Sequence, residues 1–135
     1  MSEAASQDLV ERFLTALNGH DMDAALALLS LDVAFDTREG TREIGREKVH
    51  WHLGQFRRHF REQYENIAVM VAPGGVRAAA EFTINGKYLS GKEGFPEATG
   101  QKYQIPGGMF FEIDDELISR VTTYVDMAAW RAALS

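Results

Sequence analysis

The stretch IPGGMFFEIDDELISRVTTYVD, residues 105–126, decides the fold that we expect for this chain. On both sides of the acidic turn 114–116, every second residue is expected to point to the same face. These residues are Met109, Phe111 and Ile113 before the turn and Val121, Thr123 and Val125 after it. A period of two over this length predicts a pair of strands joined by a solvated reversal. The predicted hairpin has one apolar face, so other elements have to cover it.

Helices in the N-terminal half are the expected cover. The first is predicted to begin at the N-cap Ser6 and to end at Asn18-Gly19, because its apolar residues fall on one stripe. Asp21 can cap a short second helix that runs from Met22 to about Ser30. A third helix is predicted from about Arg46 to Arg61, with four apolar residues in a narrow arc: Val49, Leu53, Phe56 and Phe60.

One strand is predicted between the second and third helices, and the others are predicted after the third helix. The predicted strands are 31–35, 67–72, 76–85, 103–113 and 117–125, and a last helix is predicted over 128–134. The polar segment 36–45 and the Gly-rich and Pro-rich segment 90–101 are predicted to be loops, and Pro106-Gly107-Gly108 is predicted to form a β-bulge. This order indicates an α+β fold in which a strongly curved antiparallel sheet wraps around the N-terminal helices. The concave side of such a sheet is predicted to enclose a pocket.

The composition narrows the class of protein. A chain of 135 residues is predicted to form one domain over 1–135, and its net charge of −6 argues against nucleic acid as a partner. The chain has no Cys, which excludes disulfides and thiol nucleophiles. The longest apolar run, 24–29, is too short to span a membrane, and the first eight residues lack the features of a secretory signal. We therefore expect a cytoplasmic protein without a membrane partner.

Several motifs in order resemble the nuclear transport factor 2-like superfamily, in particular its ketosteroid isomerase-related and SnoaL-like (polyketide cyclase-like) branch. The motifs are Gly19-His20-Asp21 with the helix that follows, Asp32-Val33, Gly45-Arg46-Glu47, the segment 94–100 (GFPEATG), Ile105-Pro106-Gly107 and Phe111-Glu112-Ile113. The resemblance covers nearly the whole chain. It implies a cone-shaped α+β barrel with a deep pocket, and a homodimer formed through the convex face of the sheet.

Two of the three catalytic residues of the ketosteroid isomerases have no equivalent in this chain. The oxyanion-binding Tyr of that enzyme corresponds to Phe13, and its protonated Asp corresponds to Met109. Neither side chain can donate the hydrogen bonds that stabilise an enolate, which argues against steroid double-bond isomerisation by that route. The catalytic base corresponds to Asp36 or, in the stricter match, to its neighbour Thr37.

Two carboxylates are candidate catalytic groups. Asp36 ends a predicted strand at the presumed mouth of the pocket, where burial could raise its pKa, or it could form an ion pair with Arg38 or Arg42. Asp126 resembles the acidic residue that precedes the last helix in SnoaL-like cyclases, and it could instead be a simple N-cap for that helix.

His52 is the third catalytic candidate, because it borders the apolar stripe of the third helix. His50 and His52 point in nearly opposite directions on a helix, so the sequence predicts no metal site, and no cofactor is predicted either. The residues predicted to line the pocket are Phe13, Phe35, Phe56, Phe82, Tyr103, Met109, Phe111 and Thr123.

Three functions stay open at this point. The first is an isomerase, cyclase or hydrolase that transfers protons on a small, apolar, cyclic or polyketide-like molecule. The second is a ligand-binding module without catalysis, which Phe13 and Met109 favour. The third is a dimeric adaptor whose pocket is filled by its own side chains.

Overall fold

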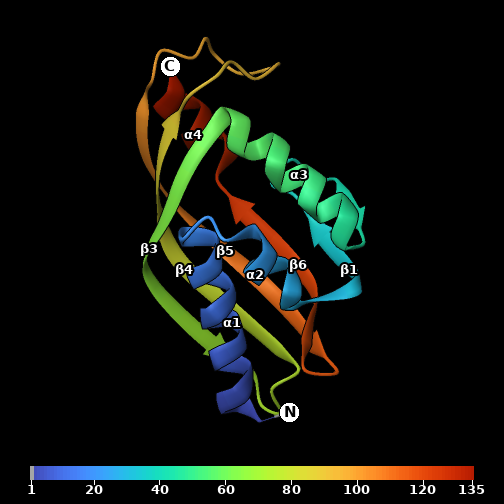
Figure 1. Cartoon of the computed structure of the whole chain (residues 1–135). Coiled ribbons are helices and arrows are strands. Elements are labelled where there is room, and N and C mark those ends of the chain that lie inside the picture. Colours follow the sequence, from blue (N-terminus) through green and yellow to red (C-terminus); the bar gives the residue numbers. More distant parts are fainter. Residues whose placement is uncertain (1) are drawn as a thin grey trace.

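The computed structural model describes residues 2–135 and confirms the α+β class. Helices α1, α2 and α3 lie on the concave side of one curved sheet, and α4 lies at its end (Figure 1). In chain order the elements are α1 (Glu3–Asn18), α2 (Met22–Ala27), β1 (Leu29–Asp36), β2 (Arg42–Ile44), α3 (Arg46–His59), β3 (Phe60–Val71), β4 (Arg77–Tyr88), β5 (Lys102–Asp114), β6 (Leu117–Val125) and α4 (Met127–Leu134).

The sheet is open and has the strand order β2-β1-β6-β5-β4-β3. The predicted hairpin of β5 and β6 lies in its middle, with Met109 opposite Thr123. All neighbouring strands are antiparallel except β1 and β6, which are parallel with Phe35 opposite Val121. The prediction of an entirely antiparallel sheet is wrong at this pair, which joins two strands distant in sequence. None of the helices in residues 2–135 is long and apolar enough to cross a membrane.

Three helix boundaries differ from the prediction. Helix α2 ends at Ala27 and not near Ser30, because Leu29 already begins β1. The N-cap of α1 is Ser2, whose hydroxyl accepts a hydrogen bond from the Ala5 amide at 3.0 Å. Ser6 is buried in the helix and donates to the Gly75 carbonyl at 2.5 Å, so it fastens α1 to the turn before β4. Helix α3 ends at His59, because Phe60 is already extended and begins β3. Phe60 still faces the core, so its place in the apolar spacing was correct while its helical assignment was wrong.

The segment Pro106-Gly107-Gly108 is a regular part of β5, and the predicted bulge is wrong. Its pairing with β4 and β6 runs without a shift, and the irregularity in β5 falls later, between Glu112 and Ile113. A β-carbon on Gly107 would lie 2.8 Å from the Ile84 Cδ1 atom, and one on Gly108 would lie 3.2 Å from the Ala80 carbonyl oxygen. These glycines are therefore required by close packing against β4.

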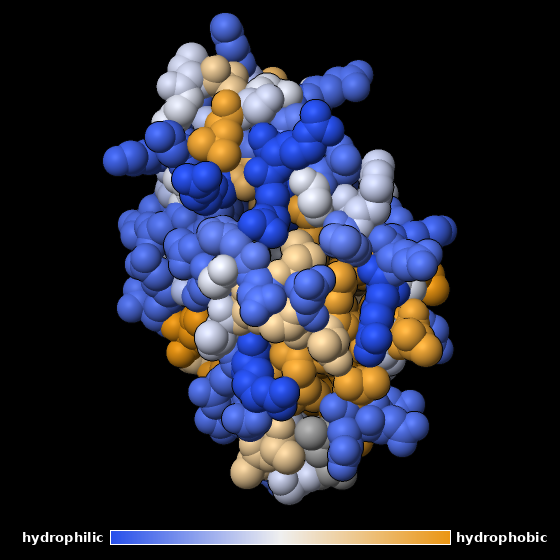
Figure 2. All heavy atoms as spheres, in the orientation of Figure 1, coloured by the Kyte–Doolittle hydropathy of each residue, from blue (hydrophilic) through white to orange (hydrophobic). Residues whose placement is uncertain are grey.

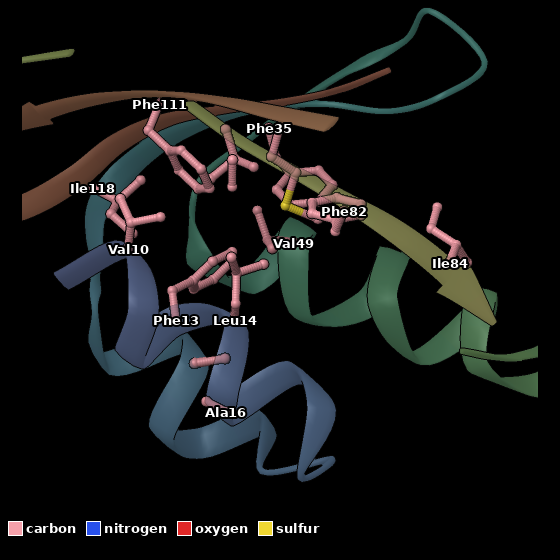
Figure 3. Packing of buried hydrophobic residues seen from close by; sticks show 14 of the residues in the cluster. Val10, Phe13, Leu14, Ala16, Phe35, Val49, Phe82, Ile84, Phe111 and Ile118 are labelled. Carbon is pink, nitrogen blue, oxygen red and sulfur yellow. The ribbon is translucent and has the colours of Figure 1, made fainter. Parts of the chain in front are cut away.

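The core lies between the concave face of the sheet and the three N-terminal helices. In Figure 3, Phe13 and Leu14 of α1 point toward Phe111 and Phe82 of the sheet, and all four side chains are buried. The Phe13 and Phe111 rings meet edge to face with centroids 6.1 Å apart, a favourable aromatic geometry. Side chains therefore fill the space between α1 and the centre of the sheet.

Candidate functional site

Two cavities lie beside this core. The outer cleft, of about 560 Å³, lies between α1, α2, α3 and the start of β3. The second cavity, which we call the inner chamber, has a volume of about 40 Å³ and lies between α3, β1, β5, β6 and α4. Leu17, Leu53, Phe56 and Tyr64 line both cavities, so the chamber adjoins the inner end of the cleft.

The inner chamber has an apolar wall with a few polar groups. Its apolar side chains are Leu17, Phe35, Leu53, Phe56 and Met109, and its polar ones are Thr37, Arg38, Glu39, His52, Tyr64, Thr123 and Trp130. A cavity that holds one water needs about 10–15 Å³, so this chamber has room for a few water-sized groups but not for a ring system. Any ring would have to stay in the outer cleft.

A buried ion pair stands at the boundary between the two cavities. Arg38 follows β1 and donates from both terminal nitrogens to the carboxylate of Glu62 on β3, and one of these hydrogen bonds is 2.9 Å long. The side chains of Arg38 and Glu62 are only 9% and 3% exposed. The Tyr103 hydroxyl donates to the same carboxylate at 2.5 Å. Every carboxylate oxygen of Glu62 is thus partnered, which is the arrangement that a buried charge requires.

The charges of this cluster fix the protonation of its members. Burial opposes the charge of Arg38, but the charge and hydrogen bonds of Glu62 outweigh it and raise the pKa of the guanidinium. Burial and the Glu62 charge raise the pKa of the Tyr103 hydroxyl, and they raise the pKa of Tyr64 to about 12. Both tyrosines are therefore neutral hydrogen-bond donors at pH 7. The guanidinium of Arg38 also lies over the Phe56 and Trp130 rings, 4.7 and 5.0 Å from their centroids.

His52 and Trp130 are two residues of the chamber wall that keep a ring nitrogen without a hydrogen bond. The His52 ring lies 5.7 Å from the Phe35 ring and makes no hydrogen bond with residues 2–135. Burial lowers the pKa of His52, although the charges of Glu43 and Glu39 oppose this shift, so the imidazole is neutral at pH 7. The indole nitrogen of Trp130 is buried near the Tyr103 hydroxyl, but it has no hydrogen-bond partner among the described residues. A buried donor without a partner is costly, and a ligand oxygen would satisfy it.

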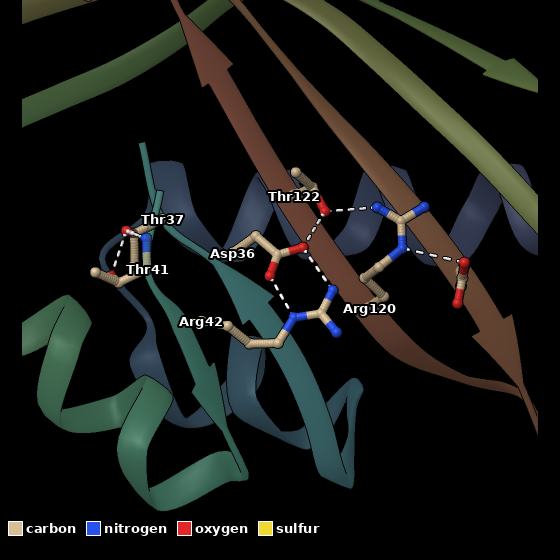
Figure 4. Close-up of polar contacts among 7 residues, drawn as sticks. Asp36, Thr37, Thr41, Arg42, Arg120 and Thr122 are labelled. Atoms are coloured by element: carbon tan, nitrogen blue, oxygen red, sulfur yellow. Dashed lines mark hydrogen bonds and ion pairs between the residues drawn. The ribbon is translucent and has the colours of Figure 1, made fainter. Parts of the chain in front are cut away.

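Asp36 points away from both cavities. Its carboxylate accepts hydrogen bonds from Arg42 at 2.6 and 3.0 Å and from the Thr122 hydroxyl at 2.6 Å, on the convex side of the sheet (Figure 4). The hydrogen bond from Arg42 lowers the pKa of Asp36, which is the opposite of the rise expected for a buried base. Of the two ion-pair partners considered from the sequence, Arg42 is the one used, and Arg38 binds Glu62 instead.

We expect Asp36→Asn to destabilise the protein at neutral pH, with a pH dependence that identifies the ion pair. A carboxylate whose pKa is lowered by folding adds stability above its unfolded pKa of about 3.9 and loses it as the pH falls further. The stability difference between wild type and Asp36→Asn in urea unfolding should therefore shrink between about pH 4 and pH 2. Asp32→Asn changes an exposed carboxylate of the same strand and should show no such loss. A difference that stays constant down to pH 2 would contradict the role of the charge.

Asp126 occupies the N-cap of α4, where its carboxylate accepts a hydrogen bond from the Ala129 amide at 3.1 Å. Neither Asp126 nor Asp36 lines either cavity, whereas His52 lines the inner chamber. The catalytic roles of these three residues stay predictions, and only one of the three lies where a ligand could reach it.

The predicted pocket residues fall into two groups. Phe35, Phe56, Met109 and Thr123 line the inner chamber. Phe13, Phe82 and Phe111 pack in the core, and Tyr103 supports Glu62 from behind the cavity wall. Among residues 2–135, no three His, Cys, Asp or Glu side chains lie close enough together to hold a metal.

Arg38, Glu62, Tyr64 and Trp130 are site residues that sequence reasoning missed. Glu62 was missed because the third helix was predicted to end near Arg61 and the next strand to begin only at residue 67, which left residues 62–66 without an assigned element. In the strand that is present, it alternates with Phe60, and both are buried. A charged residue on the inner side of a strand breaks the alternation, and that break is the signal that would have pointed to Glu62.

Comparison with known proteins places the chain in a family. It matches the SnoaL-like domain over residues 10–121, which leaves Thr123 and Trp130 of the chamber outside the matched segment. No curated protein matches the chain. The fold is shared with candidate polyketide cyclases from three bacteria, over 98% of each of their chains. The protein from Xanthomonas campestris pv. campestris is 40% identical over 98% of this chain, with a TM-score of 0.96. The protein from Pseudomonas putida KT2440 is 41% identical over 96% of this chain, with a TM-score of 0.93. The protein from Silicibacter sp. TM1040 is 38% identical over 100% of this chain, with a TM-score of 0.95.

These similarities confirm the resemblance and the cone-shaped fold on which the sequence analysis relied. The sheet of this chain is open at β2 and β3 and is not a closed barrel. The chain belongs to the SnoaL-like domain family.

Proposed function

We propose that this protein is an enzyme that binds a small, largely apolar, cyclic molecule and moves a proton on it. The observation that carries the proposal is the inner chamber, whose mainly apolar wall contains the side chains of His52 and Trp130, each with a ring nitrogen that has no hydrogen-bond partner among the described residues. The candidate polyketide cyclases that are about 40% identical to this chain support the same class of substrate. The ring system would occupy the outer cleft, and a carbonyl group would enter the chamber.

Each chamber group has a role that follows from its protonation. A neutral imidazole can take a proton from the carbon beside the carbonyl, so His52 is the proposed base. The negative charge that develops on the carbonyl oxygen would be stabilised by the Trp130 N–H and by the positive charge of Arg38, both in the same wall. The phenol of Tyr64 is a further donor that stays protonated at pH 7.

Exchange of α-protons tests this chemistry without knowledge of the natural substrate. We expect the protein to accelerate the exchange of the α-protons of 2-tetralone in D₂O, followed by NMR, above the rate in buffer. Because the base has to be neutral, the rate should be constant near pH 7 and fall at a pH below 6.5, the ordinary pKa of the imidazole. The charges near His52 are Glu39, Glu43, Lys92 and Arg38. Tetralone that binds and exchanges no faster than in buffer would contradict the catalytic proposal.

That outcome would favour a ligand-binding protein without catalysis, and one observation favours this alternative already. Three carboxylates line the two cavities, and each one is engaged: Glu62 pairs with Arg38, Glu39 pairs with Lys92, and Asp21 caps α2. No free carboxylate of the described residues remains beside the chamber to act as the acid or base. The choice between catalysis and ligand binding therefore depends on whether His52 alone can act as the base.

The homodimer through the convex face of the sheet also stays a proposal. Phe110 and Tyr124 lie side by side on that face with ring centroids 5.6 Å apart, and they are 45% and 62% exposed. Large apolar side chains that adjoin on a surface are typical of interfaces. We expect Phe110→Lys to convert a dimer into a monomer in sedimentation velocity, while Ile67→Lys, at another exposed apolar position, leaves the mass unchanged. A wild-type monomer at high concentration would contradict the proposal.

A further inference from the structure

The outer cleft has an unusual concentration of positive charge. The protein carries 20 acidic and 14 basic residues, so an average part of its surface is negative. The wall of the cleft nevertheless contains three positive charges, Arg57, Arg58 and Arg61, and the uncharged ring of His20. The face drawn in Figure 2 accordingly shows strongly hydrophilic side chains gathered over the end of α3 and the start of β3.

These positive charges have no partner within the described residues. Arg57, Arg58 and Arg61 make no ion pair with any carboxylate of residues 2–135. The two acids in the same wall are already committed, because Asp21 caps α2 and Glu62 is held by Arg38. The cleft therefore keeps a net positive charge above an apolar interior.

The charge of a helix end explains only part of this arrangement. Cations in the last turn offset the negative end of the helix dipole, which accounts for Arg57 and Arg58. The helix dipole does not account for Arg61, which belongs to β3. The neutral ring of His20 lies on the opposite wall, between α1 and α2. The two walls are close, because the side-chain amide of Gln63 on β3 lies 3.4 Å from the Nε2 atom of His20. Burial and the nearby charges of Arg57 and Arg61 lower the pKa of His20.

We propose that the outer cleft selects ligands that carry one anionic group, with aromatic or cyclic carboxylates as the chemical class. The carboxylate would lie at the rim between Arg57, Arg61 and His20. The apolar body would lie along Leu17, Leu53 and Phe56 toward the inner chamber. This inference rests on the proposed function in taking a small apolar molecule as the occupant, and it adds the charge of that molecule.

Two dyes with the same ring system, one anionic and one neutral, test whether the cleft prefers an anionic ligand. 8-Anilinonaphthalene-1-sulfonate carries one negative charge, and N-phenyl-1-naphthylamine has the same rings without it. In fluorescence titrations at low salt we expect the anionic dye to bind at least about tenfold more tightly, and we expect 0.5 M NaCl to reduce this preference. The double variant Arg57→Gln, Arg61→Gln should weaken the anionic dye about tenfold and leave the neutral dye unchanged.

Matched variants separate charge from shape. Lys48→Gln with Arg77→Gln removes two exposed positive charges that lie outside the cleft, and it should leave both affinities unchanged. Gly54 lines the cleft, and an added β-carbon there would have nothing within 4 Å, so Gly54→Trp should fill the cleft without disturbing the core. We expect Gly54→Trp to abolish the binding of both dyes, and we expect Gly54→Ala to preserve it.

The outcomes distinguish this inference from the proposed function. Equal affinities for both dyes, unchanged in the double arginine variant, would overturn the preference for anions and leave the cleft as a binding site. Binding of both dyes that persists in Gly54→Trp would place them elsewhere and overturn the inference for this cleft. The exchange of 2-tetralone, a neutral ketone, depends on His52 and tests the catalytic proposal separately.

Discussion

Glu62→Leu should lower the free energy of unfolding by about 3 to 5 kcal/mol, because it leaves the charge of Arg38 buried without a partner. The Arg38 side chain is 9% exposed and lies against the Phe56 and Trp130 rings, so the few waters that the chamber can hold replace the lost carboxylate only in part. The Tyr103 hydroxyl loses its acceptor in the same variant, which adds a second unsatisfied group. Urea unfolding at pH 7 measures the loss.

Two further variants show that the charge causes the effect. Arg38→Met combined with Glu62→Leu should recover most of the stability, because apolar residues often replace a buried ion pair without loss. Glu81→Leu makes the same change at an exposed position of β4 and should alter stability by no more than about 0.5 kcal/mol. A double variant that is as unstable as Glu62→Leu alone would contradict the explanation by an unpaired charge.

His52→Gln should reduce the rate of α-proton exchange in 2-tetralone by roughly 10²–10⁴-fold, the contribution typical of a positioned base. Glutamine keeps the size and hydrogen-bonding capacity of the side chain but cannot accept a proton at neutral pH. The remaining exchange should lose the pH dependence of wild type, since the titrating group is gone. NMR at several pH values measures both effects in one series.

His50→Gln is the matched control for this variant. His50 is exposed on the same helix, two residues before His52, and lines neither cavity. We expect His50→Gln to exchange at the wild-type rate. Equal rates for His52→Gln and wild type would show that His52 is not the base, and would favour ligand binding without catalysis.

Local patterns were enough to predict most of the fold. The strand over 117–125 and the cap at Asp21 appear in the structure as predicted, because alternation and capping depend on residues close in sequence. The three-residue strand β2 was missed, because Arg42–Ile44 is too short to show alternation and is held only by its pairing with β1. The predicted bulge at Pro106 failed for a related reason, because Gly107 and Gly108 make room for the Ile84 side chain and the Ala80 carbonyl of the neighbouring strand β4.

The candidate site was predicted less well than the fold. His52 was found because a single helical spacing places it beside an apolar stripe. Arg38 and Glu62 are 24 positions apart and meet only when β1 and β3 approach the same cavity, so no local pattern joins them. Asp36 was assigned to the cavity side, but alternation with the buried Phe35 turns it to the convex face. A shift by one residue in a strand reverses the direction of a side chain, which limits such assignments.

The parallel contact between β1 and β6 has a consequence for the rate of folding. Asp36 of β1 lies opposite Thr122 of β6, which is 86 positions further along the chain. A long loop has to close before this contact can form, and contacts between such distant segments form slowly. We therefore expect the apolar faces of α1, α2 and α3 to stay exposed until β6 joins the sheet, which makes the partly folded chain prone to aggregation.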